Sequence, residues 1–467
     1  MIRCLSIITW VLCLNSLNTT AQDDGYKINI DGINDSVVYL GSYYGDRIIS
    51  VDTAYGSKGK FVFEAKKSLP HGLYMIIRQD KNKLMEFVVE ENQKFKIKTS
   101  AEETVQNTSF SKSPQNTILF EYLAFSERKF KKLNSLKKRI DNPKATDSLL
   151  IYKEMMKEIN KEVIQFKKDF MQNHPDHITS LILELANESQ ITEKMPDSVY
   201  NNPKQKYAWY KDHYWDGIDF SDERMLRTPV FHNKLSGFFE QVVLPVPDSI
   251  ISEADKILEK TASNTDLFNY IIWYLIENFD GTEIMGQDKV FVHVAEKYFQ
   301  NDERVDASDN IKNNIIERAK KLKPLLIGKR PPNLIMMDTT GNFQSFYSIK
   351  SEYMLILFWD HDCGVCKKEI RHLKAFTDST KIDIEIFAIC TDTSLKKWKN
   401  YIIENQLNWQ HVNGTRSVTA DYHDLYDIYS TPVIYLLNKE KEIIAKRIAA
   451  EQIPDFLKNY DAMLREE

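Results

Sequence analysis

The sequence predicts a multidomain chain of mixed α+β and α/β class, with an N-terminal β-sandwich, a central helical domain and a C-terminal α/β domain. Three observations predict this: short alternating apolar runs up to about residue 100, helical spacing from about 114 to 322, and alternating strand and helix patterns after Pro331 and Pro332. At 467 residues, and with roughly 150 residues per domain, the chain has room for about three domains.

The charge of the chain excludes one class of partner. Its 62 lysines and arginines stand against 67 aspartates and glutamates, which gives a net charge of -5. A chain with this balance has no electrostatic reason to bind a polyanion. We therefore expect no nucleic-acid partner.

Residues 1–21 have the pattern of a secretory signal peptide. Arg3 precedes an apolar stretch from Leu5 to Leu14, and small residues end the segment at Ala21. An N-terminal membrane anchor is the alternative, but the apolar stretch is shorter than the ~20 residues that cross a bilayer. A second alternative is lipidation at Cys13, which would associate the protein peripherally with a membrane. No later stretch is long and apolar enough to span a membrane, so we expect an exported, periplasmic protein without a transmembrane segment in the mature chain.

Residues 22–110 are predicted to form the β-sandwich. The apolar runs are short and are separated by Gly, Asn or Asp, and Phe61 and Phe63 alternate with mostly polar neighbours. Such alternation suits strands with one buried face. The strand-like runs are YKINI, SVVYLGSYY, GKFVFEA, GLYMIIR and MEFVVEENQKFKIK.

Residues 111–326 are predicted to form the helical domain. Ile159, Val163, Phe166 and Phe170 are spaced by four, three and four, which places them on one face of a helix. Prolines divide the region into several helices rather than one coiled coil. These prolines are Pro143, Pro175, Pro203, Pro245 and Pro247.

An aromatic-rich stretch, YAWYKDHYWDGIDF, lies inside the helical region. Tyr207, Tyr210 and Tyr214 fall on one face at helical spacing. Aromatic side chains at such spacing are core residues more often than ligand-binding ones, although a platform for cargo is the alternative.

Residues 327–467 are predicted to form the C-terminal domain, which follows a linker, LKPLLIGKRPPN, with two prolines that cannot continue a helix. Alternating strands and helices predict parallel pairing, and two final strands with a short turn predict an antiparallel edge. The closing helix should start near Pro454 and bury Phe456, Leu457, Tyr460 and Leu464. The predicted strands are NLIMMDTTGNFQSFY (as a hairpin), YMLILFW, IDIEIFAIC, PVIYLLN and EIIAKRIA, with helices after the cysteines and at SLKKWKNYIIENQ.

The cysteine count argues against a metal site. Cleavage of the signal peptide would leave three cysteines, and a zinc site of four cysteines needs a second close pair. A mixed site would have to recruit His361 or His372. We therefore expect no metal.

The stretch FWDHDCGVCKKEI places Cys363 and Cys366 three positions apart at the start of a predicted helix. Unsatisfied backbone N–H groups and the helix dipole favour a thiolate at this position. Cys366, inside the helix, could form a short disulfide with Cys363 and attack a mixed disulfide held there. Asp360 and Asp362 would oppose the thiolate, whereas a charged His361 would favour it.

The stretch ILFWDHDCGVCKKEI, together with YSTPVIYLL far downstream, resembles a thioredoxin-fold domain and is most similar to the secreted TlpA/ResA-like thiol-disulfide oxidoreductases. The resemblance covers residues 327–467 and implies that Cys363 is the nucleophile and Cys366 the resolving cysteine. It also implies a cis peptide bond between Thr431 and Pro432, where a client strand pairs with the backbone. A plain trans proline at the start of a strand is the alternative.

The resemblance also assigns supporting residues. Glu369 stands three residues after the second cysteine, where relatives carry a glutamate that tunes thiol acidity; an exposed helical carboxylate is the alternative. Trp359, expected beside the cysteines, completes the substrate-binding set with Thr431 and Pro432. Thioredoxin itself has a buried aspartate where this chain has Leu357. The group that accepts the thiol proton must therefore be Glu369 or water, or the reaction uses no such group. Upstream, the β-rich and helical parts resemble domains of unassigned function in exported bacterial proteins.

The predicted activity is thiol-disulfide exchange with no cofactor beyond the redox-active Cys363–Cys366 disulfide. The partners would be a disulfide-containing client protein and a thiol electron donor, and the reducing direction is preferred. A peroxiredoxin-like peroxidase is one alternative, although the threonine expected three residues before its reactive cysteine is Asp360 here. A second alternative is a non-enzymatic scaffold in which the disulfide is structural. Cys390 ends an apolar strand and is expected to be a small core residue, with a second resolving role as the alternative.

Overall fold

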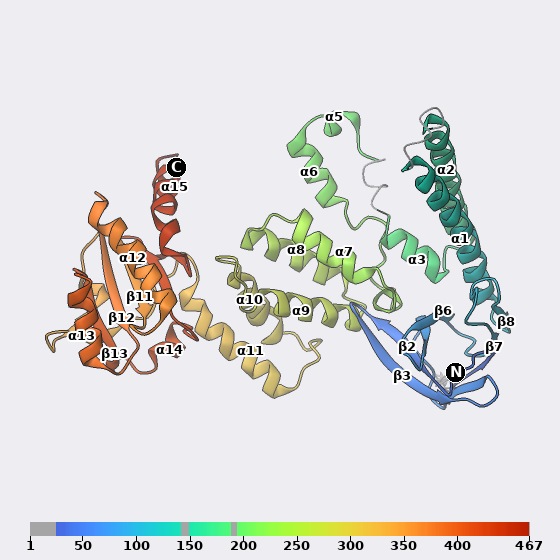
Figure 1. The fold of residues 1–467 in the computed structure, drawn as a ribbon, viewed down its shortest axis with the longest axis horizontal. Coiled ribbons are helices and arrows are strands. Elements are labelled where there is room, and N and C mark those ends of the chain that lie inside the picture. Colours follow the sequence, from blue (N-terminus) through green and yellow to red (C-terminus); the bar gives the residue numbers. More distant parts are fainter. Residues whose placement is uncertain (1–24, 142–148, 188–193, 467) are drawn as a thin grey trace, which may run out of the picture. The chain divides into compact units, whose positions relative to one another are not determined.

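The computed structural model describes residues 25–141, 149–187 and 194–466 (Figure 1). The predicted signal peptide lies outside these residues. The chain divides into two compact units, one ending at Leu235 and the other starting at Ser236. This division falls inside the stretch that was expected to form one helical domain. The first helix of that stretch contacts strands of the β-rich region, whereas Asp288 and Arg318, near its end, pair with Lys446 and Asp427 of the C-terminal domain.

The β-rich region of the first unit contains two four-stranded sheets, with strand orders β4-β1-β7-β8 and β3-β2-β5-β6. Ile28 and Phe63 from one sheet share a buried cluster with Leu40 and Ile76 from the other, so the region is the predicted β-sandwich. The strands are β1 (Tyr26–Asp31), β2 (Val37–Tyr44), β3 (Arg47–Tyr55), β4 (Lys60–Ala65), β5 (Gly72–Arg78), β6 (Lys83–Val89), β7 (Lys94–Lys98) and β8 (Ser109–Ser111).

Two details of the sandwich differ from the sequence prediction. The run MEFVVEENQKFKIK forms two strands, β6 and β7, which belong to different sheets. The chain turns between them where the buried Gln93 side chain exchanges two 2.8 Å hydrogen bonds with the backbone of Leu69. Strand β3 was not predicted, because most of its side chains are exposed and carry no alternation.

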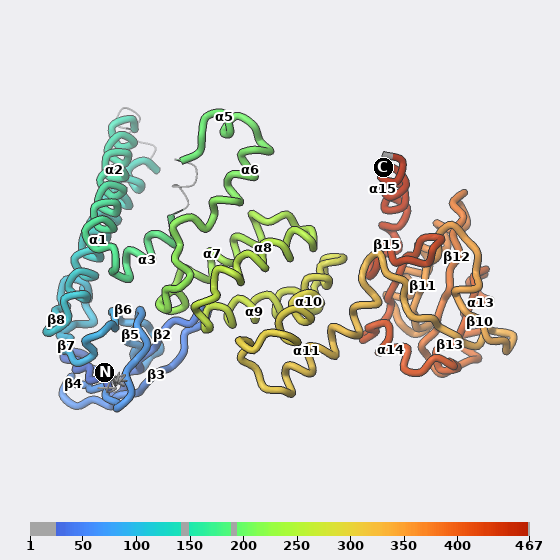
Figure 2. Tube along the Cα trace, turned by 180° about the vertical axis from the view of Figure 1, so that it is seen from behind, coloured from blue at the N-terminus to red at the C-terminus, as the bar shows by residue number. Residues whose placement is uncertain are grey.

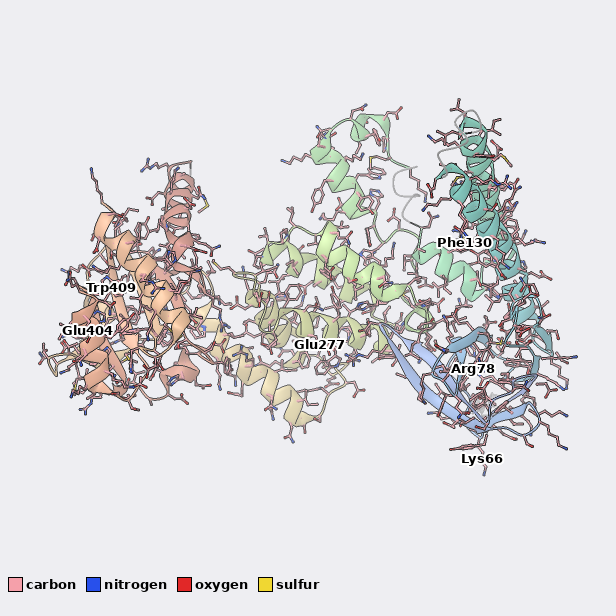
Figure 3. All side chains as sticks on the ribbon, in the orientation of Figure 1. Lys66, Arg78, Phe130, Glu277, Glu404 and Trp409 are labelled. Atoms are coloured by element: carbon pink, nitrogen blue, oxygen red, sulfur yellow. The ribbon has the colours of Figure 1, made fainter. Side chains whose placement is uncertain are left out.

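Helices follow the sandwich in the first unit. Asn116, in the first helix, is fully buried and ties that helix to β6: its amide donates to the Val88 carbonyl at 2.8 Å and accepts from the Val88 N–H at 2.7 Å. In β5, the Arg78 side chain donates a 3.0 Å hydrogen bond to the Asp35 carboxylate. Figure 3 labels Arg78, and it also labels Phe130, an exposed residue of the first helix. The helices are α1 (Pro114–Ile140), α2 (Leu149–Asn173), α3 (Ile178–Leu185), α5 (Asp197–Tyr200), α6 (Pro203–Asp212) and α7 (Phe231–Gly237).

The aromatic-rich stretch is only partly helical. Helix α6 ends at Asp212, so Tyr214 lies beyond it in a turn, where its side chain is buried and its hydroxyl donates to the Lys234 carbonyl at 3.0 Å. Tyr207 and Tyr210 are half-buried. The three tyrosines therefore do not form one continuous helical face.

The second unit begins with four helices and continues into a seven-stranded sheet of order β10-β9-β13-β12-β11-β14-β15 (Figure 2). Strands β11, β12 and β13 are parallel, and β14 and β15 form the predicted antiparallel edge. The helices are α8 (Pro247–Lys260), α9 (Thr265–Phe279), α10 (Asp288–Val294), α11 (Asp309–Leu322), α12 (Gly364–Ser379), α13 (Leu395–Glu404), α14 (Tyr422–Leu425) and α15 (Ile453–Glu466). The strands are β9 (Ile335–Asp338), β10 (Phe343–Ser345), β11 (Tyr353–Trp359), β12 (Ile384–Cys390), β13 (Gln410–Ser417), β14 (Val433–Leu437) and β15 (Ile443–Lys446).

Both faces of this sheet are covered. Every residue of β11 is buried, and its side chains alternate between two clusters. Leu355 and Leu357 share a buried cluster with side chains of α12, α13 and α15 on one face, whereas Ile356 and Phe358 share a second cluster with side chains of α14 on the other. A strand buried on both faces reads as a continuous apolar run, which explains why the sequence predicted it residue for residue.

Three predictions for this unit were wrong. Strand β13 was missed, because it is polar and contains Gly414, although it lies between β9 and β12. Leu464 is 50% exposed, because α15 extends past the sheet. The expected linker is attached to the sheet edge: the Gly328 N–H donates to the Ile443 carbonyl at 2.8 Å, and the Ile443 N–H donates to the Lys329 carbonyl at 2.9 Å.

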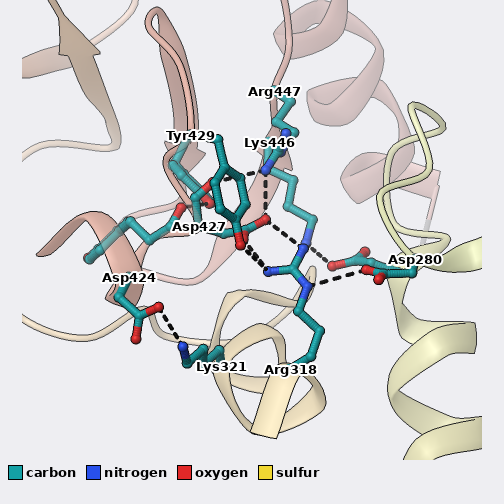
Figure 4. A network of polar contacts seen from close by, with 11 residues as sticks. Asp280, Arg318, Lys321, Asp424, Asp427, Tyr429, Lys446 and Arg447 are labelled. Atoms are coloured by element: carbon teal, nitrogen blue, oxygen red, sulfur yellow. Dashed lines mark hydrogen bonds and ion pairs between the residues drawn. The ribbon is translucent and has the colours of Figure 1, made fainter. Parts of the chain in front are cut away.

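A polar network joins the helices of the second unit to its sheet domain (Figure 4). Arg318 of α11 pairs with the buried Asp427 and, at 3.2 Å, with Asp280. Asp427 also accepts a 2.7 Å hydrogen bond from Arg447. Burial raises the pKa of the Asp427 carboxyl, but the hydrogen bond and charge of Arg318, with the charge of Arg447, outweigh it and hold this pKa below its ordinary value.

In the described part of the chain, none of the helices has the length and apolar character of a membrane-spanning segment.

Candidate active site

Cys363 lies at the carboxyl end of β11, where the chain turns into α12. It is the residue directly before the helix, so it caps α12 rather than occupying its first turn. Its sulfur accepts a hydrogen bond from the Cys366 N–H at 3.1 Å. The fold thereby directs one of the unpaired N–H groups of the helix terminus at the Cys363 sulfur.

The two cysteines have different environments. Cys363 is half-buried, whereas Cys366 is fully buried in the cluster beneath α12. Burial, followed by the hydrogen bond with Cys363, raises the pKa of the Cys366 thiol to about 12. An incoming disulfide can therefore reach only the Cys363 sulfur, and Cys366 must lose its proton during a reaction.

Thr431 and Pro432 lie beside Cys363, although they are 68 or more residues away in the sequence. Their shared peptide bond is cis, and both residues are half-buried. The Cys363 thiol donates to the Thr431 carbonyl across 3.5 Å. Because β14, which follows Pro432, pairs with β11, which precedes Cys363, the sheet topology brings the two segments together.

Glu369 is buried rather than exposed. One of its carboxylate oxygens accepts a 2.6 Å hydrogen bond from the Ala450 N–H, in the short turn before α15. Glu369 follows Cys366 by three residues in α12, so the two side chains share one face of the helix. The carboxylate is thus held inside the domain on the side of the helix that carries the buried sulfur.

Trp359 is fully buried beneath the cysteines, so its side chain is not available at the surface to a client. Its ring lies 5.3 Å from that of Tyr401 in α13. Tyr401 is half-buried, and burial raises the pKa of its hydroxyl, with the nearby Cys366 acting in the same direction. The sequence analysis missed Tyr401; its helical spacing from the buried Trp398 would have placed it on the inner face of α13.

The charges around Cys363 include a cation that the sequence analysis did not identify. Lys397 of α13 pairs with Asp362 at 3.0 Å, and both side chains are exposed. This hydrogen bond holds the pKa of the Asp362 carboxyl below its ordinary value. One of the two carboxylates that flank Cys363 is thereby neutralised.

Leu357 and Cys390 are both core residues. Leu357 is fully buried, so no carboxylate occupies that position of β11. Cys390 is fully buried as well, and burial raises the pKa of its thiol to about 12. Both facts agree with Cys390 as a small core residue.

Three family models match successive parts of the chain. Residues 27–119 match a domain of unknown function (DUF4369), residues 151–321 match a second domain of unknown function (DUF5106), and residues 327–446 match the AhpC/TSA family. No curated protein matches the chain.

Solved bacterial structures resemble parts of the chain. A crystal structure of a domain of a possible thiol-disulfide isomerase from Cytophaga hutchinsonii is 36% identical; the match covers 31% of this chain and 99% of that one, with a TM-score of 0.29. A thiol:disulfide interchange protein from a Bacteroides species is 27% identical over 29% of this chain and 89% of that one, with a TM-score of 0.25. A thioredoxin-like protein from Bacteroides caccae is 20% identical over 56% of this chain and 96% of that one, with a TM-score of 0.45.

Proposed function

Through its C-terminal domain this chain belongs to the thioredoxin-like thiol-disulfide oxidoreductases, and we propose that it exchanges disulfides of exported client proteins through Cys363 and Cys366, in the reducing direction. The observation that carries the proposal is the unequal environment of the two sulfurs. Cys363 is accessible and accepts a helix N–H, while Cys366 is buried with its thiol pKa raised to about 12. This asymmetry suits one cysteine that attacks and one that resolves.

The exchange takes place in two steps. The Cys363 thiolate attacks one sulfur of the client disulfide, which forms a mixed disulfide and releases the other client sulfur as a thiolate. Cys366 then loses its proton and attacks the Cys363 sulfur, which releases the second client thiolate and leaves the Cys363–Cys366 disulfide. Two electrons and two protons pass from the dithiol to the client, and a thiol donor must return them.

Each neighbouring residue takes a role in these steps. The Thr431 backbone, beside Pro432, offers a client strand a place to pair next to the Cys363 sulfur. Glu369 accepts the Cys366 proton, directly or through one water, because it is the carboxylate on the same face of α12. Trp359 supports the cysteines from the core instead of touching the client.

The location and the roles of the upstream domains complete the proposal. Residues 1–21 would direct export and then be removed, which leaves the mature protein in the periplasm, where disulfides form and persist. Residues 22–110 and 111–326 would position the client or the electron donor for the domain at 327–467. The family matches to residues 27–119, 151–321 and 327–446 support a division into three segments, and the positioning role is part of the proposal.

The test is the reduction potential of the Cys363/Cys366 pair in the mature chain, measured by equilibration with glutathione buffers. We expect a value near about -270 mV, as for thioredoxin, and no two-electron couple in a Cys363→Ser variant. A Cys390→Ser variant is the matched control and should keep the wild-type potential, because that sulfur is buried in the core.

Other outcomes would identify other functions. A potential near about -120 mV would reverse the proposed direction and indicate an oxidase. A pair that stays oxidised below about -300 mV and exchanges with no protein disulfide would refute catalysis and leave a scaffold with a structural disulfide. Rapid turnover of hydrogen peroxide without protein disulfide exchange would indicate a peroxidase.

A further inference from the structure

Two loops meet beside the redox cysteines, and together they carry three side chains able to bind a metal. Strands β11 and β12 are parallel neighbours in which Trp359 pairs with Cys390, so the residues that follow each strand emerge at the same sheet edge. The Thr391 N–H joins the two loops by a 2.9 Å hydrogen bond to the Trp359 carbonyl. Asp360 and His361 from one loop and Asp392 from the other offer ligand atoms within 4.8 Å of one another.

The His361 ring has no hydrogen-bond partner among the described residues, although the side chain is only 4% exposed. Burying a polar group without a hydrogen-bond partner is unfavourable. The Nδ1 atom lies 3.8 Å from an oxygen of Asp360 and 3.8 Å from an oxygen of Asp392, which is too far for hydrogen bonds. The Nε2 atom, on the other side of the ring, lies 3.5 Å from an oxygen of Asp362. None of these three contacts is a hydrogen bond, so both ring nitrogens stay unpaired within the described residues.

The spacing fits ligands that share an ion. Two ligands of a tetrahedral Zn²⁺ with bonds of about 2.0–2.2 Å are roughly 3.3–3.6 Å apart. The two distances from His361 Nδ1, 3.8 Å each, exceed this by a few tenths of an ångström, and all three ligand atoms lie within 4.8 Å of one another. Both carboxylates are already oriented by the backbone: Asp360 accepts from the Asp362 N–H at 2.7 Å, and Asp392 accepts from the Ser394 N–H at 2.5 Å. Such second contacts fix the direction of metal-binding carboxylates.

Charge and access also suit a divalent cation. As carboxylate ligands, Asp360 and Asp392 would supply the two negative charges that one dication neutralises. Lys397 pairs with Asp362 at 3.0 Å, and its charge acts on Asp392 and Asp360 more weakly than on that partner. The Asp360 and Asp392 side chains are 31% and 29% exposed, so the site opens to solvent.

We propose that Asp360, His361 and Asp392 form a binding site for a divalent cation, with Zn²⁺ as the ion that the ligands suit best. One imidazole nitrogen and two carboxylates are borderline ligands of the kind zinc accepts, with the fourth position left to water. Cysteine and histidine spacing could not reveal this site, because Asp392 comes from a different strand. The site contains no cysteine and does not depend on the proposed exchange activity.

The test is zinc binding by the full chain with Cys363 and Cys366 both replaced by serine, so that the redox thiols cannot bind the ion. Competition with a chromophoric chelator should show one zinc per chain that magnesium does not displace. His361→Asn and Asp392→Asn should each weaken binding at least about 100-fold, while His372→Asn, on α12, should leave it unchanged. Cobalt should give the weak visible absorption of nitrogen and oxygen ligands, without a thiolate charge-transfer band.

Near-UV circular dichroism of each variant checks that it is folded, and the two ligand variants test the site independently. Absence of zinc binding by the chain without the two redox thiols, or an affinity that neither His361→Asn nor Asp392→Asn changes in that chain, would overturn the proposal. The reduction potential is measured separately, so either proposal can fail while the other stands.

Discussion

Alkylation of the reduced protein should separate Cys363 from Cys366 by rate. With a thiol pKa of about 12, Cys366 at pH 8 is ionised in about one molecule in 10⁴, whereas an ordinary cysteine with a pKa of about 8.5 is ionised in about one in four. Because the thiolate is the reactive form, Cys366 should react with iodoacetamide roughly a thousandfold more slowly than a free cysteine. Its complete burial slows the reaction further.

The assay follows each sulfur in a single digest. Trypsin releases residues 351–367 with Cys363 and Cys366, and residues 382–396 with Cys390. Fragmentation of the first peptide assigns the label after timed quenching. Cys390 is an internal control, because burial raises its thiol pKa to about 12 as well.

We expect Cys363 to be labelled first, with Cys366 and Cys390 unlabelled until the protein unfolds. A Cys363→Ser variant should lose the fast phase without gaining one at Cys366. The reasoning would be refuted if Cys366 reacted within tenfold of Cys363, or if Cys363 reacted as slowly as Cys390. Either result would mean that the fold does not distinguish an attacking from a resolving sulfur.

Three further changes test the parts of the structure that surround the site. Glu369→Gln should slow disulfide exchange at pH 7 about 100-fold, with partial recovery at higher pH, because the amide can still accept the Ala450 N–H but cannot take a proton. Asp427→Asn should lower the free energy of unfolding of the second unit by about 2–4 kcal/mol, because it leaves two arginines without their shared carboxylate. The folded-state pKa of Asp427 is depressed, so its contribution is present above the unfolded pKa of about 4 and is lost as the pH falls below it; urea unfolding across this range should show a smaller pH dependence in the variant. Asn116→Ala should cost the first unit about 2–4 kcal/mol, measured by urea unfolding, because it removes both hydrogen bonds to the buried β6 backbone.

Matched variants provide the controls. Asp424→Asn removes an exposed pair with Lys321 and should change stability by less than about 1 kcal/mol. Asn134→Ala, on the exposed side of α1, should be within about 0.5 kcal/mol of wild type. Wild-type exchange by Glu369→Gln at pH 7 would exclude the glutamate as the proton acceptor. Equal effects of Asp427→Asn and Asp424→Asn would show that the buried network adds no stability.

The sequence by itself determined most strands and helices in their order and the CxxC pair at the start of a helix, and the family resemblance added Thr431 with Pro432 as its distant partners. Periodicity reports which face of a local segment is buried, so β11, with every residue buried, and the amphipathic α12 could be predicted directly. The same reasoning missed β13, because a polar strand between two others carries no apolar signal.

Only the tertiary structure decided the environment of each group. That Cys366 and Glu369 are buried, that the Cys363 sulfur contacts the Thr431 carbonyl, and that Asp392 approaches His361 all follow from the strand order β12-β11-β14. Contacts between loops depend on which strands become neighbours, and strand pairing is a property of the whole sheet rather than of any local segment. The thiol pKa values, the exposure of the two sulfurs and the spacing of the candidate metal ligands all arise from these non-local contacts. The residue types could therefore be read from the sequence, but their environments could not.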